Sequence, residues 1–357
     1  MNITFRWFGR DNDTVSLQDI KQIPGVKGIV WALHKVPPGD VWQESEIAEE
    51  INYIKSFGFH AEVVESVNIH ESIKIGNQDR DWYINNYKQT IKNLAKHGVK
   101  VICYNFMPVF DWVRTNMREP LPDGSTALFY EKKIIENTNL KAMADGVLNS
   151  SDLTLPGWEP EKLNKLEDLM EEYKNITEED LWNNLEYFLN EVLPVAESNG
   201  IKLAIHPDDP PWPVFDLPRI MKNETDLERL FSLSDSPSNS LTYCSGALGA
   251  NPNNNTVDII ENFADKSPFL HVRNIKISDN GNFIETSHLT SDGSINIKSI
   301  VKHLSDIEFD GYIRPDHGRH IWNEKSRPGY GLYDRALGIM YLNGLWDAFN
   351  SVEKGDI

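Results

Sequence analysis

Short apolar runs alternate with longer segments in which apolar residues recur every three or four positions. The apolar runs predict eight strands, at residues 3–8, 26–33, 60–64, 99–104, 202–205, 241–243, 269–274 and 312–314. The periodic segments predict helices at residues 16–20, 45–57, 79–97, 178–198, 225–233, 257–263, 297–304 and 333–349. Each strand is therefore followed by a helix, which indicates an α/β protein with a parallel sheet.

The number and size of these units favour a closed barrel. Eight βα units of about 250 residues, plus insertions, are typical of a (β/α)8 TIM barrel, and we expect residues 1–357 to form one such domain. Residues 111–175 break the alternation with several prolines and an acidic patch at 167–172. We expect a partly helical insertion there, after strand four, that caps the barrel. The alternative is a doubly wound open sheet, but no Gly-x-Gly-x-x-Gly motif follows any predicted strand.

Four residues that can bind a metal lie at the ends of the last four predicted strands. They are His206, Cys244, His271 and Asp316. In a barrel the carboxyl ends of all strands meet on one face, where the active sites of this fold lie. Imidazole, thiolate and carboxylate are protein ligands of divalent transition metals, and this set alone would suit Zn2+ or Fe2+. Each residue by itself is better explained as an ordinary buried side chain, but the four together predict a metal site.

Further polar residues fall on the same predicted face. Arg6, His34 and Lys35 belong to the first two strand ends, and Asn105 follows the fourth strand. Cations at the mouth of an acidic barrel would suit a substrate with a carboxylate, although ordinary surface charge explains each of them equally well.

Several neighbouring residues have two interpretations. Tyr330 lies in a Pro-Gly loop that could bring its phenol over the site, although turn chemistry alone explains the loop. Asp208 or Asp209 could support the ligands or simply form a solvated turn. We interpret Cys103 as a core residue, because apolar Ile102 precedes it.

Composition and charge narrow the possible partners. The 35 basic and 54 acidic residues give a formal net charge of −19, which argues against nucleic acid or an anionic membrane as a partner. No apolar run approaches the roughly 18 residues of a membrane span, and the first residues do not resemble a signal peptide. Two cysteines provide no disulfide framework, so a reducing cytoplasm is the simplest expectation.

A set of segments spread from Arg6 to the terminal helix carries a family resemblance. They are Arg6-Trp7-Phe8-Gly9, Ala32-Leu33-His34, Val64-Glu65-Ser66, Tyr104-Asn105-Phe106-Met107-Pro108, His206-Pro207-Asp208-Asp209-Pro210-Pro211, Arg314-Pro315-Asp316-His317-Gly318 and Pro328-Gly329-Tyr330. Together they resemble the mannonate dehydratase family, metal-dependent enzymes of hexuronate (glucuronate) breakdown.

The resemblance implies a barrel of the xylose-isomerase-like kind and a specific activity. This activity is a hydro-lyase reaction that converts D-mannonate to 2-keto-3-deoxy-D-gluconate and water, with a divalent metal that is usually Mn2+, although Fe2+ or another ion is an alternative. It also implies a homodimer or larger assembly. Carried over by motif, the metal ligands are His206, Cys244, His271 and Asp316, and the proton-transfer residues are His317 and Tyr330. The substrate-binding candidates are Arg6, His34, Lys35, Asn105 and Arg314.

The implied reaction needs a base at C2 and an acid at C3. A base removes the C2 proton and an acid assists the departing C3 hydroxyl, while a divalent cation stabilises the charge that develops. The sequence leaves open whether His317 or Tyr330 is the base. It also leaves two other functions open: a metal-dependent sugar isomerase or epimerase on the same barrel, and a noncatalytic barrel that binds acidic sugars. Loss of water distinguishes the dehydratase from both.

Overall fold

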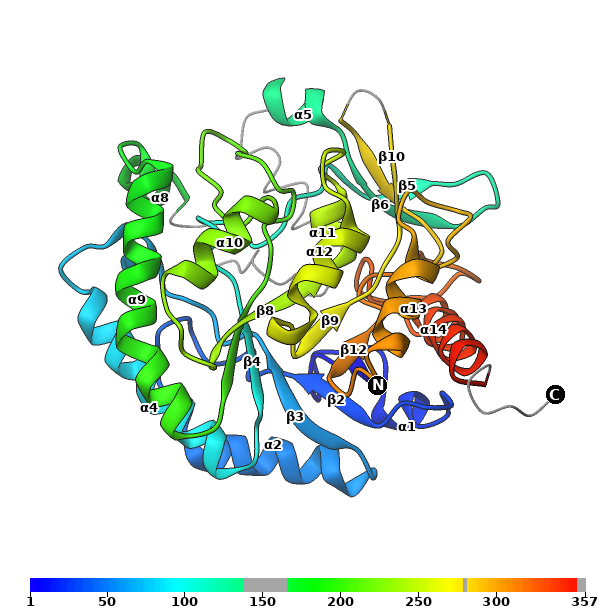
Figure 1. Cartoon of the computed structure of the whole chain (residues 1–357), viewed down its shortest axis with the longest axis horizontal. Coiled ribbons are helices and arrows are strands. Elements are labelled where there is room, and N and C mark those ends of the chain that lie inside the picture. Colours follow the sequence, from blue (N-terminus) through cyan, green and yellow to red (C-terminus); the bar gives the residue numbers. More distant parts are fainter. Residues whose placement is uncertain (138–165, 279–280, 352–357) are drawn as a thin grey trace.

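Eight parallel strands close into a barrel in the computed structural model, which describes residues 1–137, 166–278 and 281–351 (Figure 1). Around the barrel the order is β1-β12-β9-β8-β7-β4-β3-β2. The strands are β1 (Asn2–Arg6), β2 (Gly28–Trp31), β3 (His60–Glu65), β4 (Val101–Tyr104), β7 (Lys202–Ile205), β8 (Asn239–Cys244), β9 (Phe269–His271) and β12 (Tyr312–Arg314). Each corresponds to one predicted strand, so the (β/α)8 barrel is confirmed.

The barrel interior is a packed core of small and branched side chains. Val30, Val63, Val101, Cys103 and Ala204 form one buried cluster with Phe269. The residues that alternate with them along the strands pack outward against the helices, as the two-residue period of a strand requires. Cys103 is 1% exposed within this cluster, in line with its interpretation as a core residue.

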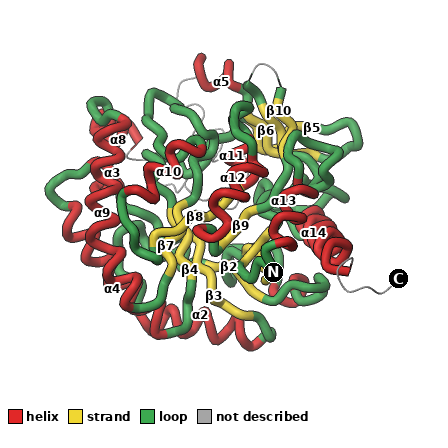
Figure 2. Tube along the Cα trace, viewed as in Figure 1, coloured by secondary structure: helices red, strands yellow, loops and turns green. Residues whose placement is uncertain are grey.

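Helices surround the barrel, as Figure 2 shows in red around the yellow strands. Those that follow the barrel strands are α1 (Leu17–Ile20), α2 (Glu44–Ser56), α4 (Arg80–Lys96), α9 (Glu178–Ser198), α10 (Glu224–Ser232), α12 (Thr256–Phe263), α13 (Ile297–Asp306) and α14 (Tyr333–Ser351). Ser16 and Thr177 begin α1 and α9 with capping boxes, in which side chain and backbone satisfy each other's hydrogen bonds. Two short helices, α3 (Glu71–Ile75) and α11 (Ser245–Gly249), were not predicted. None of the helices in the described ranges is long and apolar enough to cross a membrane.

A second, four-stranded sheet lies beside the barrel and includes part of the insertion. Its order is β10-β11-β6-β5, with β5 (Asn116–Pro120), β6 (Thr126–Tyr130), β10 (Ile275–Ile277) and β11 (Phe283–Glu285). The sequence predicted one strand at residues 269–274, but the chain leaves the barrel after His271 and pairs again in this sheet. The described part of the insertion also contains α5 (Lys132–Asn137) and α8 (Leu166–Tyr173). Residues 138–165 of the predicted insertion lie outside the described residues.

Candidate active site

A pocket opens at the carboxyl ends of the barrel strands. Residues at or just after the ends of β1, β3, β4, β7 and β12 contribute to its lining, among them Arg6, Glu65, Asn105, His206 and Asp316. The geometry of the barrel explains this convergence, because strand ends that are far apart in sequence meet on one face.

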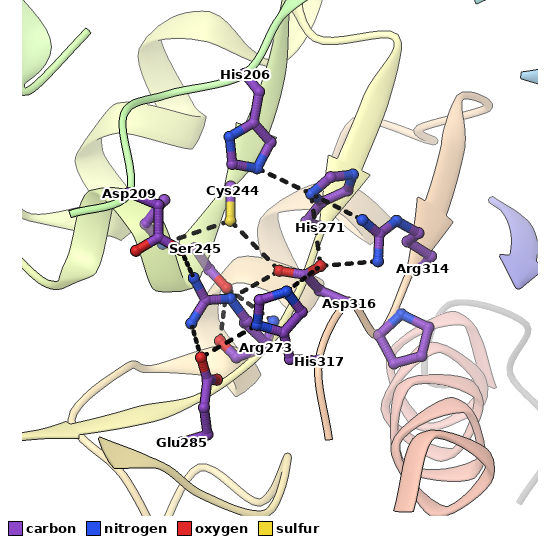
Figure 3. A network of polar contacts seen from close by, with 12 residues as sticks. His206, Asp209, Cys244, Ser245, His271, Arg273, Glu285, Arg314, Asp316 and His317 are labelled. Carbon is purple, nitrogen blue, oxygen red and sulfur yellow. Dashed lines mark hydrogen bonds and ion pairs between the residues drawn. The ribbon is translucent and has the colours of Figure 1, made fainter. Parts of the chain in front are cut away.

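Three of the predicted metal ligands converge behind this pocket (Figure 3). One nitrogen each of His206 and His271 and the sulfur of Cys244 all lie within 4.8 Å of one another. His206 Nε2 lies 3.1 Å from His271 Nδ1. The fourth predicted ligand, Asp316, lies beside these three, with Oδ2 3.7 Å from Cys244 Sγ and Oδ1 3.8 Å from His271 Nδ1.

Neighbouring groups orient both histidine rings toward this shared centre. His206 Nδ1 donates to the Pro207 carbonyl at 2.6 Å, so in the neutral ring Nε2 carries a lone pair. Arg314 Nη2 donates to His271 Nδ1 at 3.4 Å, so in the neutral ring Nδ1 carries a lone pair, and His271 Nε2 lies 3.3 Å from the Glu65 carboxylate. Two lone pairs therefore face each other at 3.1 Å, an arrangement that a cation between them would stabilise.

The donor set fits a four-coordinate divalent metal. Zinc–nitrogen bonds of about 2.0–2.1 Å and zinc–sulfur bonds of about 2.3 Å, for example, place tetrahedral ligand atoms about 3.3–3.6 Å apart. Three of the separations between ligand atoms, 3.1, 3.7 and 3.8 Å, lie close to that range, and the sulfur of Cys244 lies within 4.8 Å of both histidine nitrogens. The backbone N–H of Ala247 also donates to Cys244 Sγ at 3.4 Å, which fixes the position of the sulfur.

Asp316 is held as an anion by surrounding cations. Burial alone would raise its pKa, but His317, Arg314, His271 and Arg273 lower that pKa well below the ordinary value. Arg314 Nη1 lies 2.8 Å from Oδ1 and Arg273 Nε donates to Oδ2 at 2.7 Å. The residue has a φ of 60°, a left-handed conformation that is uncommon outside glycine.

The two predicted proton-transfer residues contact each other next to this group. His317 Nε2 lies 3.0 Å from the hydroxyl of Tyr330, and His317 Nδ1 lies 3.2 Å from Glu285 Oε1. Burial and the nearby charge of Asp316 raise the pKa of Tyr330, so its phenol stays protonated. The Tyr330 ring is fixed by an edge contact with Phe8 at 4.8 Å.

The predicted substrate-binding residues do not all fall in the pocket. Arg6, His34, Asn105 and Arg314 line it, whereas Lys35 is exposed and is not among its lining residues. Arg6 is 4% exposed and contacts His34 Nε2 at 3.3 Å, and its Nη1 has no hydrogen-bond partner among the described residues. Arg314 already binds two carboxylates, Asp316 and Glu65.

Sequence reasoning gave no role to four residues that contact the predicted ligands or the network around them. Glu65 ends β3 and carried the same strand-end signal as the predicted ligands. Arg273 lay inside a predicted strand, Glu285 in a segment without a predicted element, and Arg114 in the insertion. The arginines lower the pKa of Glu285 to about 2 and hold the pKa of Asp209 below its usual range, although burial alone would raise both. Asp208 instead accepts from the backbone N–H groups of Ile220 and Met221.

The fold and this site together define a (β/α)8 barrel enzyme with a candidate metal centre at the carboxyl face of the strands. Residues 1–356 match the family model described as D-mannonate dehydratase (UxuA). The chain belongs to the D-mannonate dehydratase family, and it is therefore a hydro-lyase.

Individual relatives agree with this assignment. The mannonate dehydratase of Bacillus subtilis (strain 168) is 61% identical over 357 residues, which cover 100% of this chain and 99% of the relative. The mannonate dehydratase 1 of Halalkalibacterium halodurans is 60% identical, with 99% and 98% covered. A crystal structure of mannonate dehydratase from Streptococcus suis serotype 2 has a TM-score of 0.90 and 42% identity, with 99% and 96% covered. A xylose isomerase domain protein from Planctomyces limnophilus shares the fold, with a TM-score of 0.56 and 10% identity over 98% of both chains.

Proposed function

We propose that this protein converts D-mannonate to 2-keto-3-deoxy-D-gluconate and water, with a divalent metal held by His206, Cys244, His271 and Asp316. The observation that carries the proposal is the cluster formed by two imidazole nitrogens 3.1 Å apart, a thiol and a carboxylate. A bound divalent cation would stabilise negative charge on the substrate and polarise a hydroxyl group. We propose Mn2+ on the family resemblance, although the nitrogen and sulfur ligands also suit Fe2+ or Zn2+.

We assign the two proton transfers to His317 and Tyr330. Glu285 accepts from His317 Nδ1, which leaves Nε2 with the lone pair that a base needs. His317 then takes the C2 proton, and the electron pair of that bond forms the C2–C3 double bond as the C3–O bond breaks. Tyr330, whose phenol is protonated, donates to the departing hydroxide, so that one water leaves. The resulting enol takes up a proton at C3 and loses the proton of its C2 hydroxyl, which gives the 2-keto acid.

Arg6 is the proposed partner of the substrate carboxylate. It is buried in the pocket wall, and its Nη1 has no hydrogen-bond partner within the described ranges, so one strong donor is left for an anion. Arg314 is engaged with two carboxylates, and we assign it the neutralisation of Asp316 and Glu65 instead. His34 and Asn105 line the pocket and are proposed partners of substrate hydroxyl groups. For Lys35, substrate binding stays a prediction.

We also propose that residues 111–175 cap the barrel as part of a single domain. Asp111 and Trp112 line the pocket, and the Trp112 ring lies 5.8 Å from that of His317.

A cytoplasmic location is proposed because both cysteines are free thiols. A homo-oligomer is proposed because exposed apolar residues lie along one face of α14, among them Leu337 and Met340.

A mass balance tests the proposed reaction. Protein stripped of metal by a chelator is incubated with D-mannonate, with and without added Mn2+, and the products are measured by mass spectrometry. We expect a product lighter by one water only when the metal is present. A product of unchanged mass would instead show isomerisation, and no product with Mn2+, Fe2+, Co2+ or Zn2+ would contradict the proposed reaction.

A further inference from the structure

Arg273 binds three carboxylates at once behind the pocket (Figure 3). It follows β9, two residues after His271, and is 1% exposed. Nε donates to Asp316 Oδ2 at 2.7 Å, Nη1 to Glu285 Oε1 at 2.8 Å and Nη2 to Asp209 Oδ2 at 2.7 Å. A guanidinium is planar and its N–H directions are fixed, so these bonds set the positions of the carboxylates relative to one another.

The link continues from Glu285 to the proposed base. Glu285 Oε1 accepts from Arg273 and lies 3.2 Å from His317 Nδ1. The opposite nitrogen of the same ring faces the Tyr330 hydroxyl at 3.0 Å. Arg273 therefore contacts the proposed metal ligand Asp316 directly and His317 through Glu285. Through Glu285 it influences the direction in which the His317 lone pair points.

The segment after Cys244 is shaped to hold Arg273 in this place. Ser245 Oγ donates to the Arg273 carbonyl at 2.7 Å and accepts from the Arg273 N–H at 3.0 Å. Gly246 packs so closely that a Cβ atom there would lie 2.4 Å from Arg273 Cζ. Both the backbone and the guanidinium of Arg273 are therefore fixed by residues next to a proposed metal ligand.

Arg114 provides a matched comparison within the same cluster. It is equally buried and donates to Asp209 at 2.7 and 2.9 Å and to Glu285 at 2.9 Å. Its bonds and ion pairs within the described residues do not include Asp316. Arg114 and Arg273 thus share the burial and two of the three carboxylates, and they differ in the contact with the proposed metal ligand.

We propose that Arg273 is a positioning residue that sets the Asp316 carboxylate toward the metal and, through Glu285, the His317 ring toward the reacting atoms. This inference rests on the metal site and the proton transfers of the proposed function. Arg273 would thereby fix the position of His317 relative to the metal. A displacement of a reacting group by about 1 Å can lower the rate by a factor of about 10².

The test compares Arg273→Lys with Arg114→Lys, both loaded with Co2+. Each variant keeps its buried positive charge but loses the planar fork. In Arg273→Lys we expect the cobalt d–d bands to shift, because the Asp316 carboxylate moves, while the thiolate band from Cys244 remains. We also expect kcat to fall by about 10–100-fold with little change in KM, as when other partners of metal ligands are removed. Arg114→Lys should keep the wild-type d–d bands.

Two results would overturn the inference: wild-type d–d bands in Arg273→Lys, or the same spectral change in both variants. If Arg273→Lys does not fold, Gly246→Ala replaces it, since the added methyl group displaces the guanidinium without removing its charge. This variant should show the same shift of the d–d bands, and wild-type bands would contradict the proposal. If wild-type protein with Co2+ shows no thiolate band, the metal site of the proposed function fails first, and the inference falls with it.

Discussion

Each histidine of the candidate metal site has a partner that fixes its orientation. His206 Nδ1 donates a hydrogen bond to the Pro207 carbonyl, and the Glu65 carboxylate lies 3.3 Å from His271 Nε2. Such partners commonly change metal affinity or activity by about 10–100-fold when they are removed. His317 has a partner of the same kind. Glu285 faces its Nδ1, and Tyr330 faces its Nε2.

Removal of the Tyr330 hydroxyl tests its role as the acid. Tyr330→Phe keeps the ring against Phe8 but loses the group 3.0 Å from His317 Nε2. We expect kcat for D-mannonate to fall by about 10²–10⁴-fold, while the thermal midpoint and bound metal stay close to wild type. Steady-state kinetics and a thermal melt measure both effects.

Tyr104→Phe is the matched control for this variant. Tyr104 is also buried, and within the described part of the chain its hydroxyl has no hydrogen-bond partner. Its loss should leave kcat within about twofold of wild type, since an unpaired hydroxyl contributes little to the folded state. Equal rates for Tyr330→Phe and wild type would exclude Tyr330 as the acid.

At the scale of elements, buried ion pairs join the four-stranded sheet to the barrel. Arg114 precedes β5, Asp209 follows β7 and Glu285 ends β11, and the arginine binds both carboxylates. Removal of one partner from such a buried pair costs about 3–5 kcal/mol, because the other charge is left uncompensated. The same bonds place Glu285 beside His317, so the docking of this sheet and the geometry of the site depend on each other.

This cluster predicts a loss of stability in acid. The folded-state pKa of Glu285 is about 2 and that of Asp209 is also depressed, below the values of about 4.3 and 3.9 expected in the unfolded chain. Their contribution to the free energy of unfolding is therefore complete above about pH 4.5 and is lost as the pH falls toward about 2. Urea unfolding in the presence of a chelator, measured across this range, should show the decline.

Glu285→Gln identifies the source of this pH dependence. The variant lacks one titrating group, so its free energy of unfolding should fall less steeply below pH 4.5 than that of wild type. Glu46→Gln, a change at an exposed position of α2, should keep the wild-type slope. Identical slopes for Glu285→Gln and wild type would show that the buried cluster does not account for the acid sensitivity.

The whole molecule is strongly acidic, but eight charged side chains around the candidate metal ligands sum to zero before a metal or substrate binds. Four buried arginines face four carboxylates there: Arg6, Arg114, Arg273 and Arg314 with Glu65, Asp209, Glu285 and Asp316. A divalent cation and the thiolate of Cys244 together add one positive charge. The site then matches an aldonate monoanion, even though the protein carries a net charge of −19.

The barrel and the meeting of the strand-end residues could be predicted because both follow from local patterns. Apolar runs indicate the eight strands. The closure of the barrel then brings His206, Cys244 and His271 to one face, regardless of the conformation of the loops. Arg273 and Glu285 could not be found in this way. Glu285 reaches His317 only because β11 pairs in a second sheet, and that sheet depends on pairing between segments about 150 residues apart, β11 and β6.

The proposed metal site is tested most directly by the amount of Mn2+ bound per chain. Equilibrium dialysis would measure it for wild type, Cys244→Ser and Cys103→Ser at the same concentration of free Mn2+. Both cysteines are buried, but Cys103 packs in the barrel core and Cys244 lies beside the two histidines. We expect about one ion per chain in wild type and Cys103→Ser, and much less in Cys244→Ser. Full occupancy in Cys244→Ser would show that the metal is not bound at this site.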